Sequence, residues 1–435
     1  MLEDTKQSTA RCNIVILLTT LVVLRSVVNN RPNPAPVVAL CATFAEILLV
    51  GLLWVFCPHG RQRTKMEWLL LVYAGWGILT RFLLQDLELI YSVRLEVLML
   101  FEICAAFFVM HDADHKTASK IFTIITAILC AILTVWSVCG LVVSLTNVEK
   151  ITLPLVTVEP YPGDKFLSIS PHNRNETAVW FMIGLWLLAY QWTVCKRKLW
   201  RIPMAVSMLL MYIAIALQRS RTVWIAFAVA VGLLAASWLL ALPWKSLPKY
   251  LFMAATAVAY AFLAYKSFSV VNDVFSAFHK VPSLDGYLEN RKTVASRSST
   301  WMAEIRFLME NPKALLFGQP RGAIAENMYR FYNGHSTSIP HLHNGFMQVV
   351  AMYGLPGLVL LCSFLFALAR KALRVYFTKE MAPERILTLL LIGIVFDGLM
   401  EPVFTAWVGL STAVFMLAAG WMTRACAERS TNGQA

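Results

Sequence analysis

The sequence predicts an all-α polytopic membrane protein with about twelve transmembrane helices and one large polar loop. The first observation is composition, since 58% of the 435 residues are hydrophobic and only 14% are charged, which excludes a soluble globular chain. The second is the recurrence of apolar segments about 20 residues long, the length that crosses a bilayer core. The third is hydropathy too high for a barrel, so that only helices can satisfy the backbone polar groups in lipid.

The apolar segments define the spans in chain order. They cover Cys12–Asn30, Pro36–Cys57, Met66–Leu84, Val93–Met110, Ser119–Leu145, Thr177–Cys195, Ile202–Gln218, Thr222–Leu242, Tyr250–Val271, His343–Ala369, Ile386–Phe404 and Ala406–Thr423. The chain therefore divides into helices 1–9 (residues 1–271), a loop forming a small helical cap (272–342), and helices 10–12 with a tail (343–435).

Basic residues in the short loops set the orientation of the chain. Lysine and arginine gather after the second, fourth, sixth, eighth and tenth predicted helices, so these alternate loops are inside. An even number of spans then places both termini on the inner side, and the first segment lacks a small-residue cleavage site, which favours a retained helix. The net charge of +13 indicates contact with anionic membrane lipids and not with nucleic acid.

Two arginines break this charge rule. Arg219 and Arg221 flank Ser220 in the short connection between the seventh and eighth predicted helices, which lies outside. One interpretation is snorkelling side chains paired with acidic neighbours or lipid head groups. The other is an anion site, because guanidinium groups fork onto phosphate oxygens and a helix N-terminus adds free N–H groups there.

The loop 272–342 contains one clear helical pattern. Its apolar residues recur at helical spacing: Trp301, Ile305, Leu308 and Met309. The predicted helix, Ser298–Met309, lies on the membrane surface or closes over a cavity, and Asn311-Pro312 ends it. Spacing alone favours a solvated role for Arg297 at its start, and Arg321, in a glycine-rich turn, has the same ambiguity.

The other outer loop, Thr146 to Glu176, is rich in turn residues and could bind sugar hydroxyls or form a packed lid. Its Asn175-Glu176-Thr177 matches a glycosylation sequon, a pattern too common to carry weight. No paired-cysteine, H-E-x-x-H or D-x-D arrangement occurs, so the sequence indicates neither a metal nor a cofactor.

Two histidines stand where this polar loop meets the tenth predicted helix. His341 and His343 precede Asn344 at the outer membrane edge, and the helix then carries Gly354, Pro356 and Gly357. The two glycines share a face on which another helix can approach, and the proline favours a kink. A histidine at such an edge is commonly an interfacial hydrogen-bonder, yet its titration near neutrality also suits proton transfer.

Acidic residues inside predicted helices are functional candidates, because such groups are expensive in lipid. They are Glu46, Glu102, Asp397 and Glu401. Glu401 lies nearest the outer face, where it could orient His343 or an arginine. The alternative is a structural ion pair, such as Glu46 with Arg25.

Several of these motifs together resemble a known family. His343-Asn344, nine residues, then Gly354-Leu355-Pro356-Gly357 is similar to the H-N-x9-G-x-x-G signature of the O-antigen ligase and polymerase superfamily of bacterial envelopes. Arg219 and Arg221 resemble its arginine pair, and Arg297 followed by Trp301 resembles its R-x-x-x-W element. The chain departs from the family at Gly318-Gln319-Pro320, where G-x-G is common.

The resemblance implies a GT-C-like glycosyltransferase in the bacterial inner membrane. Its site would face the periplasm, and it would use no metal, cofactor or nucleotide sugar. The donor would be O-antigen on undecaprenyl pyrophosphate, and the acceptor a sugar hydroxyl of lipid A-core. His343 would be the base of an inverting transfer, while Arg219, Arg221 and Arg297 would bind the pyrophosphate. His341, Asn344, Arg321 and Glu401 would be accessory.

Other functions remain possible on the sequence. Within the superfamily, an O-antigen polymerase or a protein O-oligosaccharyltransferase differs only in its acceptor. A lipid-linked oligosaccharide flippase would also join basic residues to many helices, but it predicts charge along a central path and often inverted repeats. The unusual arginines and histidines of this chain gather instead at the outer face, which favours an enzyme.

Overall fold

The computed structural model describes most of the predicted helical core. The described residues are 13–17, 20, 45, 48, 64–84, 90–113, 115–146, 148–152, 157–160, 167–170, 174–218, 220–241, 250–251, 254–255, 258, 294–320, 323–324, 326–327, 342–377, 382–404 and 409–431. The first, second and ninth predicted spans lie mainly outside these residues, as does Glu46, and they stay predictions.

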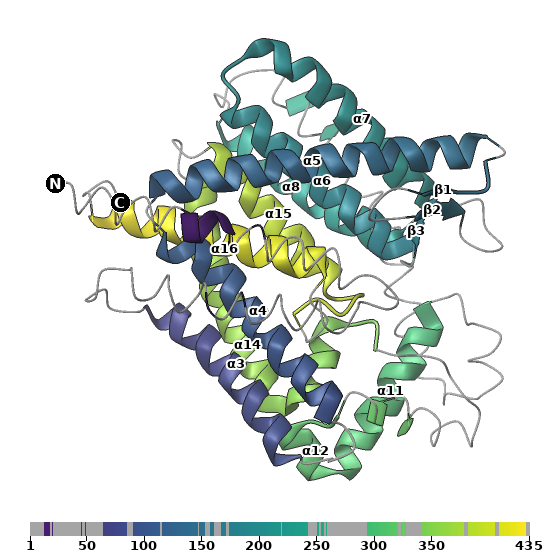
Figure 1. The fold of residues 1–435 in the computed structure, drawn as a ribbon, viewed down its shortest axis with the longest axis vertical. Coiled ribbons are helices and arrows are strands. Elements are labelled where there is room, and N and C mark those ends of the chain that lie inside the picture. Colours follow the sequence, from purple (N-terminus) through teal and green to yellow (C-terminus); the bar gives the residue numbers. More distant parts are fainter. Residues whose placement is uncertain are drawn as a thin grey trace.

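Each remaining predicted span coincides with a helix (Figure 1). These helices are α3 (Lys65–Leu83), α4 (Ile90–Asp112), α5 (His115–Leu145), α6 (Arg174–Val194), α7 (Arg201–Gln218), α8 (Arg221–Ala241), α14 (Gly345–Phe377), α15 (Ala382–Asp397) and α16 (Leu410–Thr431). Among the described residues, five helices are long and apolar enough to cross a membrane, in or near α3, α5, α6, α7 and α14. The structure is therefore mostly helical as predicted, while the number of twelve spans stays a prediction.

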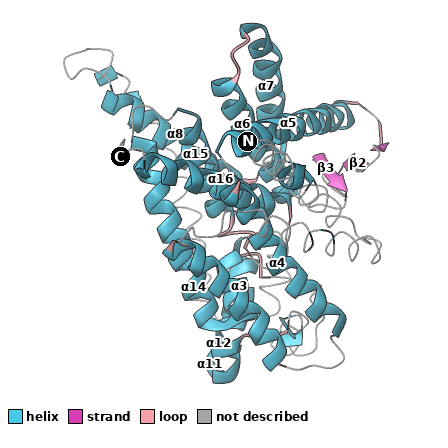
Figure 2. Cartoon of the chain, turned by 60° about the vertical axis from the view of Figure 1, so that its left-hand side comes forward, coloured by secondary structure: helices cyan, strands magenta, loops and turns pink. Residues whose placement is uncertain are grey.

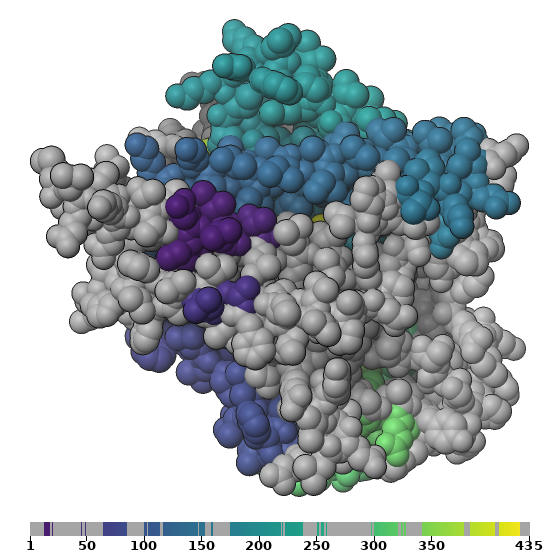
Figure 3. Space-filling model, in the orientation of Figure 1, coloured from purple at the N-terminus to yellow at the C-terminus, as the bar shows by residue number. Residues whose placement is uncertain are grey.

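The helices pack into one bundle in which α6 lies against α5, α7 and α15, α14 lies against α3, and α16 lies against α4. At the edge of the bundle, α7 lies beside α5 (Figure 3). Its exposed surface carries large apolar side chains. Ile202, Val206 and Leu209 are each more than half exposed. Apolar surface of this kind is expected on a helix that faces lipid, because lipid tails are as apolar as the side chains.

A small antiparallel sheet forms in the loop between α5 and α6, where the sequence predicts turns. Its strands are β1 (Ile151–Thr152), β2 (Thr157–Pro160) and β3 (Leu167–Ser170), in the order β1-β2-β3. The sheet lies against the ends of α5 and α6 (Figure 2), and Val158 is fully buried. The loop is thus partly packed. We call the end of the bundle that carries this sheet and the start of α6 the site end.

The eleventh predicted span is wrong at its C-terminal end. The sequence predicts a helix as far as Phe404, but α15 ends at Asp397 and residues 398–404 form turns. Gly398 and Pro402 explain the difference, because glycine favours helix ends and the residue before a proline is pushed out of the helical region. Glu401 consequently lies in a loop and not inside a helix. We call residues 398–404 the Glu401 loop.

The tenth predicted span also begins later than expected. His343 was predicted as its first residue, whereas α14 begins at Gly345 and His343 precedes it with a φ of 50°. The predicted kink is present: Gly354 has a non-helical φ of 71° and ψ of −179°, two residues before Pro356. The helix is therefore two segments joined at Gly354.

The kink is filled by backbone from a shorter helix, not by a neighbouring membrane helix. After α11 (Val294–Glu310), which confirms the predicted amphipathic helix, comes α12 (Pro312–Phe317), packed against α14. A Cβ atom on Gly354 would lie 2.2 Å from the Leu316 carbonyl oxygen. Reciprocally, Gly318 has a φ of 77°, and a Cβ atom there would lie 2.1 Å from the Met352 carbonyl oxygen. The predicted close approach at Gly354 therefore exists, but its partner is α12.

The carbonyl groups freed by the kink find donors. Gln319 donates its backbone N–H to the Ala351 carbonyl at 2.8 Å, and Trp76 of α3 donates its indole N–H to the Tyr353 carbonyl at 2.7 Å. Arg81 of α3 binds the Gln319 carbonyl at 2.9 Å. These bonds fix α11 and α12 at the site end relative to α3 and α14.

Gly354→Ala is expected to destabilise the protein. An alanine must adopt a φ near +71°, which costs about 1–3 kcal/mol, and its methyl group must displace the Leu316 carbonyl. Thermal unfolding in detergent measures the effect as a lower Tm. Gly75→Ala is the control, because nothing lies within 4 Å of a Cβ atom at Gly75. An equal Tm for the two variants would contradict the account of the kink.

Candidate active site

The Glu401 loop is a compact series of turns at the end of α15. The N–H groups of Met400 and Glu401 both donate to the Asp397 carbonyl, at 2.8 and 2.9 Å. Phe404 has a positive φ of 76°, and its carbonyl accepts a 2.7 Å hydrogen bond from the hydroxyl of Tyr73 in α3. Both ends of the loop are therefore held, and Glu401 is presented from a defined backbone.

Asn344 fastens the start of α14 to this loop. Its Oδ1 accepts from the N–H groups of Phe346 and Met347, at 3.0 and 2.9 Å, so it is the N-cap of the helix. Its Nδ2 donates to the Leu399 carbonyl at 2.9 Å, and the next N–H, of Gly345, donates to the Gly398 carbonyl at 2.7 Å. The residue expected to be accessory thus caps a helix and joins two segments.

His343 lies between two fixed neighbours in a left-handed backbone conformation. A non-glycine residue at φ 50° is uncommon and is strained unless its surroundings hold it. Leu342 supplies that restraint, since its N–H donates to Gln348 Oε1 at 2.8 Å and its carbonyl accepts from the indole of Trp301 at 2.7 Å. The imidazole, 28% exposed, lies with Nδ1 3.4 Å from Glu401 Oε2.

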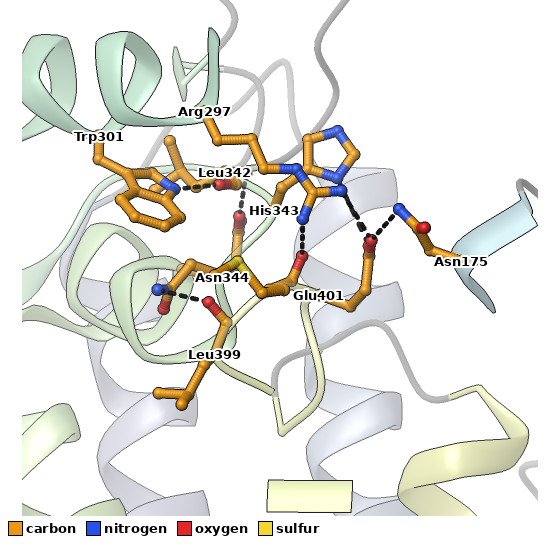
Figure 4. Close-up of polar contacts among 10 residues, drawn as sticks. Asn175, Arg297, Trp301, Leu342, His343, Asn344, Leu399 and Glu401 are labelled. Atoms are coloured by element: carbon orange, nitrogen blue, oxygen red, sulfur yellow. Dashed lines mark hydrogen bonds and ion pairs between the residues drawn. The ribbon is translucent and has the colours of Figure 1, made fainter. Parts of the chain in front are cut away.

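Glu401 is the meeting point of three segments that are distant in sequence (Figure 4). Arg297, near the start of α11, binds Glu401 Oε1 through Nη2 at 3.2 Å and the Met400 carbonyl through Nη1 at 3.0 Å. Asn175, at the start of α6, donates its Nδ2 to the same oxygen at 3.2 Å. The other carboxylate oxygen faces His343. The carboxylate is only 9% exposed, so these partners offset the free-energy cost of burying its charge.

Further carboxylates surround this centre. Asp397 is buried, and the charges of Glu401, Glu176 and Arg297 all act on it. Its Oδ1 has no hydrogen-bond partner among the described residues. Carboxylates crowded around one arginine are stable together when one of them is protonated or when further positive charge lies nearby. Within the part of the chain that the structure describes, no three metal-binding side chains are grouped as a metal site.

The structure unites some of the predicted site residues and leaves others undescribed. His343, Arg297, Asn344 and Glu401 form one contact group. Arg219, His341 and Arg321 lie outside the described residues, and Arg221 is the first residue of α8, where only its backbone is described. Glu102 lies in α4, and its side chain likewise lies outside the described part.

The junction of α7 and α8 lies at the site end, because α6, α7 and α8 follow one another through short connections (Figure 1). Gln218, the last residue of α7, is fully buried, and neither end of its amide has a partner among the described residues. Ser220 is the N-cap of α8, because its carbonyl accepts a hydrogen bond from the N–H group of Trp224. The buried hydroxyl of Ser220 also lacks a hydrogen-bond partner among the described residues. Two buried polar groups therefore flank Arg219, and a polar ligand would satisfy them.

Sequence reasoning missed the role of Asn175. The glycosylation sequon that contains Asn175 gives no physical reason to expect a contact with Glu401. The two residues are also too far apart in the sequence for any helical or strand spacing to relate them. The one local signal was its position at the outer start of the sixth predicted helix, the same level at which Glu401 was expected.

The comparison with known families matches the segment that carries this geometry. Residues 206–362 match the family model described as O-antigen ligase, and they include α8, Arg297, His343 and the kink of α14. No curated protein matches the chain. The matched segment ends within α14, before α15 and Glu401. This segment of a multi-pass membrane protein is therefore similar to the O-antigen ligase family.

Proposed function

We propose that the protein transfers O-antigen polysaccharide from undecaprenyl pyrophosphate to a sugar hydroxyl of lipid A-core, with inversion at the anomeric carbon. The observation that carries the proposal is the pairing of His343 with Glu401, on a carboxylate that also binds Arg297. A base, a group that orients it and a cation at one membrane edge are what such a transfer requires.

His343 is the proposed general base. When Nδ1 donates to Glu401, the neutral imidazole carries its lone pair on Nε2, which can accept a proton. The acceptor hydroxyl then gives its proton to Nε2 as its oxygen attacks the anomeric carbon. Glu401 stabilises the imidazolium that forms, as a carboxylate does in a hydrolase triad. The strained backbone of His343 fixes the imidazole relative to both substrates.

The arginines are proposed to stabilise the leaving group. The bond from the anomeric carbon to pyrophosphate breaks in the same step, and negative charge develops on the departing lipid pyrophosphate. Arg297 uses two of its five N–H groups on Glu401 and Met400, so that it has donors for phosphate oxygens. Arg219 and Arg221 would contribute from the α7–α8 junction, where the α8 N-terminus and the unpartnered Gln218 and Ser220 favour a polar anion.

The same proposal places the site at the periplasmic face of the inner membrane, with both termini in the cytoplasm. The basic residues of the alternate loops support this orientation. Undecaprenyl-linked O-antigen would then reach the site from the lipid, along the apolar surface of the bundle. His341 and Arg321 keep their proposed accessory roles in acceptor binding.

Expression in cells that lack their own O-antigen ligase tests the function. Capping of lipid A-core with O-antigen is the expected result. If lipid A-core stays uncapped while the length distribution of the donor polysaccharide changes, the protein is a polymerase. Attachment of the polysaccharide to protein would instead identify an oligosaccharyltransferase, and export of the donor without transfer would identify a flippase.

Glu401→Gln is expected to lower kcat with little change in KM for either substrate. The glutamine keeps the shape of the side chain but removes the charge that faces the imidazole and Arg297. Hydrogen bonds to charged groups contribute about 1.5–3 kcal/mol, which corresponds to roughly 10- to 150-fold in rate. Initial rates with purified enzyme, donor and acceptor measure the effect. An unchanged kcat would contradict the assigned role of Glu401.

A further inference from the structure

One face of α11 carries more than Arg297. Residues Arg297, Trp301 and Glu304 are spaced by four and three positions, so they lie one above another on the helix. Arg297 contacts Glu401, and Trp301 holds the Leu342 carbonyl, directly before His343 (Figure 4). The position of α11 therefore determines both the cation and the backbone that precedes the base.

Glu304 is the third contact of this face, and it is fully buried. Its Oε1 accepts a hydrogen bond from Gln319 Nε2, and Gln319 Oε1 accepts one from Asn327 Nδ2 at 2.6 Å. The other carboxylate oxygen of Glu304, Oε2, is buried and has no hydrogen-bond partner among the described residues. A buried carboxylate that receives only neutral amide donors is costly unless it is protonated.

The partner of Glu304 is anchored on the rest of the bundle. The backbone N–H of Gln319 donates to Ala351 in the α14 kink, and its carbonyl accepts from Arg81 of α3. Gln319 follows Gly318, whose backbone lies against Met352. Gln319 thus links Glu304 to α14 and α3, at the turn where the sequence departs from the G-x-G pattern.

We infer that Glu304 is a positioning residue for the proposed reaction: through Gln319 it holds α11 on the α14 kink, in the position from which Arg297 and Trp301 reach the His343 segment. The catalytic part of this inference rests on the proposed function. The structural part concerns the docking of α11 and can be measured without any reaction.

The protonation of Glu304 gives this docking a pH dependence. Burial raises the pKa of Glu304 from 4.5 to about 7, and the nearby amide group of Asn327 offsets only part of that rise. Since the pKa is raised in the folded protein, docking is strongest while Glu304 is neutral. It weakens as the pH rises above about 4.5, and the loss is complete above about 7.

The charged groups on the neighbouring elements do not reverse this sign. Lys313 of α12 and Glu326, beside Asn327, are exposed. Arg81 of α3 is buried, but it binds the Gln319 carbonyl, not the Glu304 carboxyl. The ring of Tyr353 in α14 lies beneath the Arg81 guanidinium, with 5.3 Å between the ring centroid and the guanidinium carbon. On α11 itself, Arg306 pairs with Glu310 on the exposed side.

Hydrogen exchange of purified protein tests the inference, with rates corrected for intrinsic exchange. In the wild type, amides of α11 should exchange faster as the pH rises from about 5 to about 8. Glu304→Gln keeps the acceptor for Gln319 but cannot ionise, so its corrected exchange should not change with pH. Glu304→Ala loses the link and should exchange faster at every pH. Glu310→Ala is the control, because Glu310 is 65% exposed on the same helix.

Initial transfer rates on the same variants supply the catalytic readout. Glu304→Ala should lower kcat/KM by about tenfold, the size of one lost hydrogen bond, and Glu304→Gln should restore it and remove the loss at alkaline pH. The inference is overturned if Glu304→Ala matches Glu310→Ala in exchange, if Glu304→Gln keeps the wild-type pH step, or if exchange changes without any change in rate. A wild type that docks α11 as described but transfers no O-antigen would instead refute the proposed function.

Discussion

Replacing His343 with alanine is expected to lower kcat by about 10²–10⁴-fold, the usual contribution of a general base. Alanine removes the imidazole beside Glu401 Oε2, which is the group proposed to accept the proton of the acceptor hydroxyl. The KM for the lipid-linked donor should change little, because the pyrophosphate is assigned to the arginines. Steady-state kinetics with purified enzyme in liposomes separate the two quantities.

Two comparisons make the result specific. His115→Ala, at the first residue of α5, is the control and should transfer at the wild-type rate. His343→Ala must also retain the wild-type Tm, which excludes misfolding as the cause, because alanine, like histidine, must adopt the φ of 50° at this position. Full activity in a normally inserted His343→Ala protein would remove the base from the mechanism.

Replacing Arg297 with alanine is expected to lower kcat by about 10²–10³-fold, by comparison with the loss of one oxyanion-hole donor. Two changes add together. The leaving pyrophosphate loses a cation, and Glu401, 9% exposed, loses a charged partner. Arg297→Lys keeps the charge but cannot bind Glu401 and Met400 through two nitrogen atoms, so its rate should lie between those of the alanine variant and the wild type.

Arg306→Ala is the matched control for Arg297. Arg306 lies on the same helix, but it is 69% exposed and pairs with Glu310 at the surface. Such exposed pairs contribute about 0–1 kcal/mol, so activity should stay near the wild-type level. An Arg297→Lys enzyme with an unchanged rate would argue against a forked contact, and equal rates for Arg297→Ala and Arg306→Ala would remove Arg297 from the site.

The helices themselves could be predicted well from local patterns. Long apolar runs mark the spans, and the spacing of Trp301 and Leu308 correctly predicts the buried face of α11. Met309, assigned to the same face, is 70% exposed. The kink of α14 was expected at Pro356, but the break is at Gly354, because the carbonyl of Leu316 occupies the space where a Cβ atom would be.

The assembly of the site could be predicted only in part. Hydropathy stays high through Phe404, so a window of apolar residues cannot detect that Gly398 and Pro402 end α15 and release the Glu401 loop. The contacts of Glu401 with Asn175 and Arg297 join residues more than a hundred positions apart, which no periodicity encodes. The short strands β1–β3 are stable only as a paired and packed sheet, so turn-rich composition concealed them.

Reconstituted transfer with defined substrates tests the central claim most directly. Purified protein in liposomes receives undecaprenyl-pyrophosphate-linked O-antigen and lipid A-core, and both the capped acceptor and the released undecaprenyl pyrophosphate are quantified. The account predicts equal amounts of the two products, an inverted anomeric linkage, and loss of both products together in the His343→Ala enzyme. Release of undecaprenyl pyrophosphate without capped lipid A-core, or transfer that does not depend on His343, would contradict it.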